Sequence, residues 1–94
     1  MGDAQLRGKS VAAVAKEVAE GFLFLNPIVL RTFEGPDYKT LHFHLRKVQK
    51  EVRSEKFPFH DTAGLRQRNQ RLQRLYGALI VLEHAARERR IHLA

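Results

Sequence analysis

Apolar residues recur at steps of three and four in two long stretches of this sequence, and this spacing limits what the chain can fold into. A period near 3.6 residues places such residues on one face of an α-helix. We therefore predict two long amphipathic helices, over 37–55 and 62–90. The apolar positions are Tyr38, Leu41, Leu45, Val48 and Val52 in the first stretch, and Leu65, Leu72, Leu75, Leu79, Leu82 and Ala86 in the second.

Two further helices are expected in the N-terminal third of the chain. Valines at three- and four-residue steps after a capping serine predict a helix over 10–25. Asn26 and Pro27 end that helix and start another over 27–33, because asparagine caps helices and proline is tolerated at the first helical position. Residues 1–9 have no periodic apolar pattern, so we expect this segment to be flexible.

With 94 residues, of which 44% are hydrophobic, the chain can bury one modest core. We predict one all-α domain over residues 1–94, a small helical bundle. Its two long helices form an antiparallel hairpin, and the N-terminal helix packs across them. Helix 62–90 would span roughly 43 Å, more than such a globule needs, so we expect its C-terminal half to pair with a second copy in a homodimer.

Residues 28–45 also allow a different structure. Apolar and polar residues alternate over 41–46, and 28–33 is rich in strand formers, so a β-hairpin closed by 34–37 is an alternative. The 3.6-residue period continues through Val52 without interruption, which favours helices over the hairpin.

The composition excludes several classes of chemistry. Without cysteine the chain has no thiolate nucleophile, disulfide or cysteine-based metal site. No apolar run approaches the roughly 20 residues that a membrane-spanning helix needs, so we expect no membrane partner. The first six residues lack a basic region followed by an apolar core, so we expect a cytoplasmic protein. Gly8-Lys9-Ser10 resembles the end of a phosphate-binding loop, but Asp3 stands where that motif requires glycine.

No catalytic or metal-ligating constellation is visible. His42 and His44 would lie on one side of a strand, yet on a helix residues two apart point in nearly opposite directions. His60 and Asp61 could add ligands, but nothing in the spacing brings them to the other two histidines. We therefore expect no enzyme activity, no cofactor and no metal.

The strongest polar feature is the segment 65–74, which holds four arginines and three glutamines without an acidic residue. The chain as a whole carries 17 Lys and Arg against 10 Asp and Glu, a net charge of +7, which favours polyanionic partners. Arginine and glutamine contact phosphates and base edges. Five residues are expected to share one helix face opposite the leucines: Arg66, Gln67, Gln70, Arg71 and Arg74.

A second basic face is expected on helix 37–55, opposite its apolar residues. Phe43 lies among its cations, where an aromatic ring can stack on an unpaired base or anchor a protein contact. Basic helix faces are also often plain solvated surface, which is the ordinary alternative for both patches. The cations of this face are Lys39, Arg46, Lys47 and Lys50.

These features suggest two functions. The first is nucleic-acid binding, or a role in a nucleic-acid-associated regulatory complex, through the Arg/Gln-rich face. The alternative is a non-enzymatic protein-interaction or assembly module that recognises an acidic or amphipathic partner. Its candidate contacts are Phe57 and Phe59 in the loop between the long helices, the apolar segment 22–25, and Arg68, which projects from the apolar side of its helix.

Overall fold

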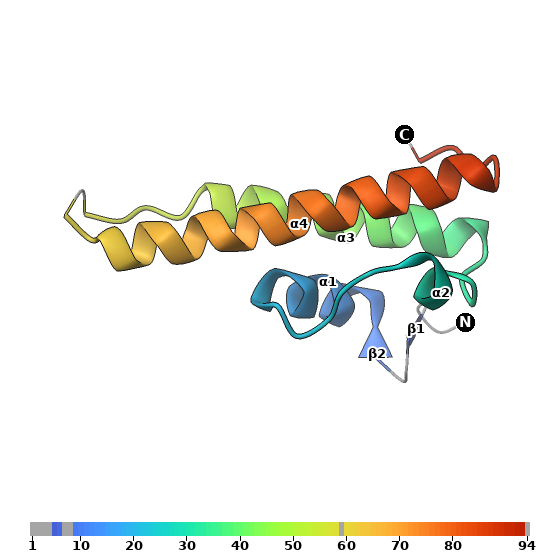
Figure 1. Ribbon diagram of the computed structural model, residues 1–94, viewed down its shortest axis with the longest axis horizontal. Coiled ribbons are helices and arrows are strands. Elements are labelled where there is room, and N and C mark those ends of the chain that lie inside the picture. The colour runs from blue at the N-terminus through green and yellow to red at the C-terminus, as the bar shows by residue number, and fades with distance from the viewer. Residues whose placement is uncertain (1–4, 7–8, 59, 94) are drawn as a thin grey trace.

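Helices dominate the computed structural model, which describes residues 5–6, 9–58 and 60–93 (Figure 1). The all-α prediction is confirmed for these residues. Two strands of two residues each pair in antiparallel fashion just before the first helix, with Gln5 opposite Ser10. The rest of the segment predicted to be flexible, 1–4 and 7–8, lies outside the described residues. The elements in chain order are β1 (Gln5–Leu6), β2 (Lys9–Ser10), α1 (Val11–Glu20), α2 (Pro27–Leu30), α3 (Gly35–Arg53) and α4 (Thr62–Glu88).

The two long helices form the predicted antiparallel hairpin. Figure 1 shows α3 and α4 side by side along the length of the molecule, with α1 packed across them and α2 beside the end where α3 begins. The molecule is elongated, with extents of 44 × 25 × 21 Å. The alternative hairpin over 28–45 is wrong, because 35–53 is one continuous helix.

Helix α1 is shorter than predicted, because a glycine ends it. Ser10 caps its first turn by accepting a hydrogen bond from the Ala13 amide at 3.2 Å. Gly21 has φ +85°, and its amide donates to carbonyls of the last turn. Only glycine adopts this left-handed conformation readily, so it stops the helix and turns the chain. Residues 22–25, which continue the apolar pattern, are therefore not helical.

The other helix ends lie close to the predictions. Helix α2 ends at Leu30 instead of residue 33. The Glu34 amide donates to the Asp37 carboxylate at 2.8 Å in a capping box that starts α3. Asp61 caps α4 by accepting from the Gly64 amide at 3.0 Å.

The core lies where α1, α3 and α4 meet. All five apolar residues predicted for α3 are buried, from Tyr38 to Val52. In α4 the first buried residue is Leu75, while Leu65 and Leu72 are only half-buried. The core therefore fills the space beside the second half of α4 and thins out beside its first half. Among the described helices, none has the length and apolar character needed to cross a membrane.

Candidate nucleic-acid interface

The Arg/Gln-rich segment of α4 does not form the single exposed face that was predicted. Arg66, Gln67 and Gln70 are exposed. Arg71 and Arg74 are half-buried and turn toward α1, so that part of the prediction is wrong. Arg71 precedes the buried Leu75 by four residues, the spacing that places two side chains on the same side of a helix.

Arg71 joins three parts of the chain. Its Nε lies 3.2 Å from a carboxylate oxygen of Glu20 at the end of α1, and its Nη1 lies 3.4 Å from one of Glu55 in the loop before α4. The side chain is 28% exposed. Because both carboxylates belong to the same molecule, this guanidinium is already engaged before any phosphate arrives.

Arg74 completes the C-terminal end of α1. Its Nη1 donates to the Ala19 carbonyl at 3.1 Å. That carbonyl lies in the last turn, where no amide of the same helix is free to pair with it. The guanidinium also covers Gly21, because a β-carbon there would lie 3.0 Å from the Arg74 Cζ. Arg74 therefore has a structural role at the end of α1.

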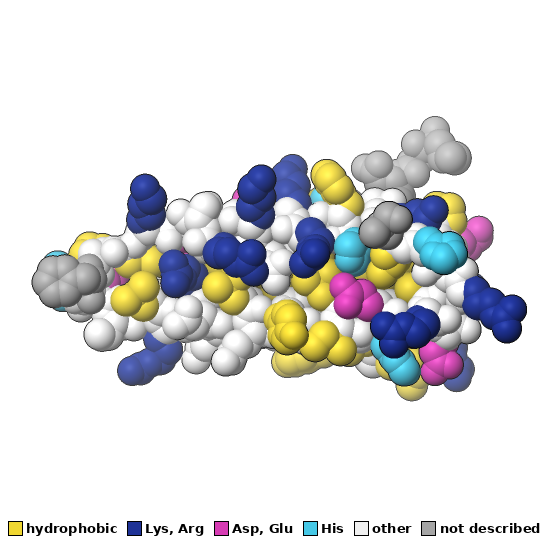
Figure 2. All heavy atoms as spheres, turned by 90° about the horizontal axis from the view of Figure 1, so that it is seen from above, with side chains coloured by type: hydrophobic (Ala, Val, Ile, Leu, Met, Phe, Trp, Pro, Cys, Tyr) yellow, Lys and Arg dark blue, Asp and Glu magenta, His cyan; other side chains and the backbone are white. Residues whose placement is uncertain are grey.

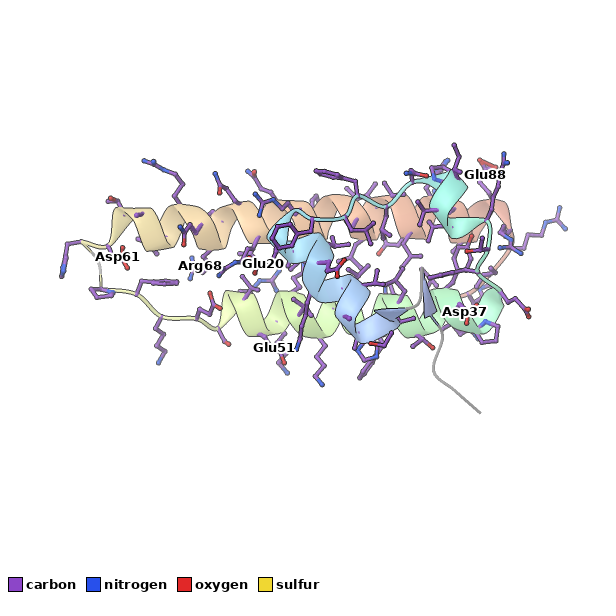
Figure 3. All side chains as sticks on the ribbon, turned by 90° about the horizontal axis from the view of Figure 1, so that it is seen from below. Glu20, Asp37, Glu51, Asp61, Arg68 and Glu88 are labelled. Carbon is purple, nitrogen blue, oxygen red and sulfur yellow. The ribbon has the colours of Figure 1, made fainter. Side chains whose placement is uncertain are left out.

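Arg68 also turns inward, beside the end of the core. Its Nη1 donates to the Glu55 carbonyl at 3.3 Å, so the side chain extends past the core to the loop. Its Nε is buried and has no hydrogen-bond partner among the described residues. Figure 3 labels Arg68 and Glu20 and shows both in the region between α4 and α3.

Helix α3 carries a basic surface that solvent can reach. We call Lys39, Phe43, Arg46, Lys47 and Lys50 the α3 stripe. All five side chains are exposed, and this face of α3 points away from the core, as predicted. Within the described part of the chain, no ion pair or hydrogen bond involves the side chains of the four cations, so their charge is available.

Phe43 is the aromatic member of the α3 stripe. It is 61% exposed, and its ring meets His44 edge to face at a centroid distance of 5.3 Å. Figure 2 views α3 and α4 from the side opposite α1 and shows Lys and Arg side chains along much of the length, with few carboxylates among them. The arrangement combines cations with an exposed ring.

The candidate protein contacts fall into different environments. Phe57 is half-buried against the first turn of α4, where a β-carbon at Gly64 would lie 2.7 Å from its ring. Phe59 lies outside the described residues. In the segment after α1, Phe22 and Phe24 are 80% and 73% exposed.

The histidines and acids considered for a metal site are used elsewhere or lie apart. His42 Nε2 lies 3.6 Å from a Glu83 carboxylate oxygen, which links α3 to α4. Asp61 is the cap of α4. Across residues 5–6, 9–58 and 60–93, no group of three His, Cys, Asp or Glu side chains could hold a metal ion.

A comparison of the chain with protein-family models, curated proteins and solved structures finds no match. The assignment of function therefore depends on the residues described above.

Proposed function

We propose that this protein binds nucleic acid through the α3 stripe. The observation that supports this most directly is the exposure of four cations on one helix face, with no carboxylate partner among the described residues. Phosphate contacts from Lys and Arg supply most of the affinity in such complexes. Arg71 and Arg74 are left out of the proposed site because the chain itself occupies them.

Phe43 favours a single strand over a duplex. A base can stack on an exposed ring only when it is unpaired, and such stacking contributes about 1–3 kcal/mol per base. Lys39 and Lys50 are separated by 11 helical residues, or roughly 16 Å, so the α3 stripe can follow a few nucleotides of backbone. Arg66, Gln67 and Gln70 of α4 are exposed and could add contacts farther along the strand.

The salt dependence of binding tests this proposal. Four phosphate contacts on a single strand imply a slope of about −2.8 in log K against log salt. Fluorescence anisotropy with a labelled 20-nucleotide oligo(dT) and the corresponding oligo(U) measures that slope. Replacing Lys47→Gln and Lys50→Gln together should make the slope shallower by about 1.4, because two contacts are lost.

The matched control is the pair Lys16→Gln and Arg31→Gln. Both residues are exposed and lie outside α3, and the double change lowers the net charge by the same amount. Its slope should equal that of the unchanged protein. If both double variants shift the slope equally, the binding follows net charge and the α3 stripe is not the site.

Protein interaction is the second candidate function, favoured by the exposure of Phe22 and Phe24. Phe24 also lines an apolar groove of about 310 Å³ between residues 23–25 and α4. Contiguous exposed apolar surface marks interaction sites. Affinity capture from native lysate, with and without nuclease, separates the two functions: material lost after nuclease supports nucleic acid, and a retained stoichiometric protein supports this alternative.

A further inference from the structure

The outer face of α4 has no partner among the described residues. Tyr76 and Ile80 are 63% and 49% exposed there, one turn apart. Gly77 lies between them in sequence and beside both on the helix surface, and a β-carbon at that position would meet no heavy atom within 4 Å beyond the neighbouring backbone of α4. The middle of the longest helix therefore presents an apolar surface with a gap in its side chains.

Nothing within the described chain requires glycine at position 77. Glycine in an exposed helix interior costs about 1 kcal/mol relative to alanine. Its backbone is helical, so no left-handed conformation explains it. A residue without a side chain permits another backbone to come close, which points to a second helix approaching from outside.

Charges on the same face indicate which helix fits. Arg66 and Glu88 each lie 11 residues from Gly77, or close to three full turns, so all three point the same way. If a second copy of α4 crosses antiparallel at Gly77, Arg66 of each copy lies opposite Glu88 of the other. A parallel crossing would bring Arg66 against Arg66, which is unfavourable.

Both flanks of this face suit a two-fold axis perpendicular to α4. Such an axis turns each flank toward its own equivalent. Tyr76 and Ile80 lie on the flank beside α3, as the contact of the nearby Glu83 with His42 shows. Beside the opposite flank of α4 lies the segment after α1, where Phe24 lines a groove together with Gly77. Apolar residues thus meet apolar residues on both sides of Gly77.

We propose that this protein forms an antiparallel, two-fold symmetric homodimer through the outer face of α4, centred on Gly77. Glu88 also lies 3.4 Å from His84 of its own helix, but both side chains are exposed, which leaves room for Arg66 of the second copy. This proposal goes beyond nucleic-acid binding and does not depend on it. The symmetry places α3 of both copies on the same side of the dimer.

Sedimentation of the full chain without nucleic acid tests the dimer. We expect a concentration-dependent equilibrium between monomer and dimer. Gly77→Leu should weaken it by about tenfold or more, because the added side chain keeps the helices apart. The control, Gln67→Leu, adds the same side chain to an exposed position of α4 away from the crossing and should leave the equilibrium unchanged. A wild-type chain that stays monomeric at all concentrations overturns the proposal.

A charge exchange tests the antiparallel arrangement. Arg66→Glu and Glu88→Arg should each weaken the dimer, and the double variant should restore it, because each swapped residue again meets its opposite. Circular dichroism checks that every variant stays helical. If the double variant is weaker than either single variant, the two residues do not face each other and the antiparallel arrangement is wrong.

Discussion

Helices α3 and α4 are both rich in basic residues, but they use them differently. In the α3 stripe the cations point to solvent and have no partner in the described chain. In the first half of α4, Arg68, Arg71 and Arg74 bind carboxylates and carbonyls of the same molecule. The number of basic residues in a segment is therefore a poor measure of the charge it offers to a partner.

The difference arises from where the core ends. The fully buried part of the apolar stripe of α4 begins at Leu75, and α1 ends at Glu20, close to Arg71. Arg68 and Arg71 continue the stripe beyond this point, where too little apolar surface remains to bury a leucine. Their aliphatic stems can cover the end of the core while their guanidinium groups meet polar atoms of the loop and of α1.

Among the changes that test this contrast, charge reversal of Arg71 should cause the largest loss of stability. Arg71→Glu would place a third carboxylate beside Glu20 and Glu55, so both ion pairs become repulsions. We expect the free energy of unfolding to fall by about 1–2 kcal/mol. The matched change in the α3 stripe, Lys47→Glu, should cost less than about 0.5 kcal/mol. Urea denaturation followed by circular dichroism measures both.

Equal losses in the two variants would mean that Arg71 is no more structural than a surface lysine. The double variant Arg71→Glu with Glu20→Lys supplies a further check, because it restores one of the two ion pairs. It should recover part of the lost stability.

Replacement of Arg74 should cause a smaller loss of stability. Arg74→Met keeps most of the stem but loses the hydrogen bond to the Ala19 carbonyl. We expect a loss of about 1 kcal/mol, typical of one hydrogen bond, and faster amide hydrogen exchange at the C-terminal end of α1. The control is Arg46→Met in the α3 stripe. Because Arg46 is exposed, this substitution should leave both stability and amide exchange unchanged.

Much of the fold could be predicted because it depends on local signals. The 3.6-residue period placed α3 and α4 to within a few residues, and the capping residue Asn26 placed the start of α2. The end of α1 was missed because Phe22 and Leu25 continue its apolar period. Gly21 ends the helix through its left-handed conformation, which overrides that pattern.

The candidate site was predictable on α3 and only in part on α4. On α3 the apolar residues run without a gap, so the opposite face follows from the helix period. On α4 the apolar residues leave a gap between Leu65 and Leu72, so the helix period does not define the direction of the buried face there. The four-residue spacing from Arg71 to Leu75 does indicate that Arg71 lies on the buried side of the helix. The contact of Arg71 with Glu20 could not be inferred, since it needs the packing of α1.

The smallest predicted effect is the change in salt dependence on replacing Arg66, compared with that on replacing a lysine of the α3 stripe. Arg66 is the arginine of segment 65–74 that stays exposed, so it could bind phosphate, yet it lies on α4 and faces the proposed dimer contact. Lys50→Gln should make the salt slope for oligo(dT) shallower by about 0.7, the share of one phosphate contact on a single strand. Arg66→Gln should change the slope by much less than that, while weakening self-association in the same samples. If Arg66→Gln shifts the slope as strongly as Lys50→Gln, the nucleic acid reaches α4, and the contrast between the two helices applies only to the half-buried arginines.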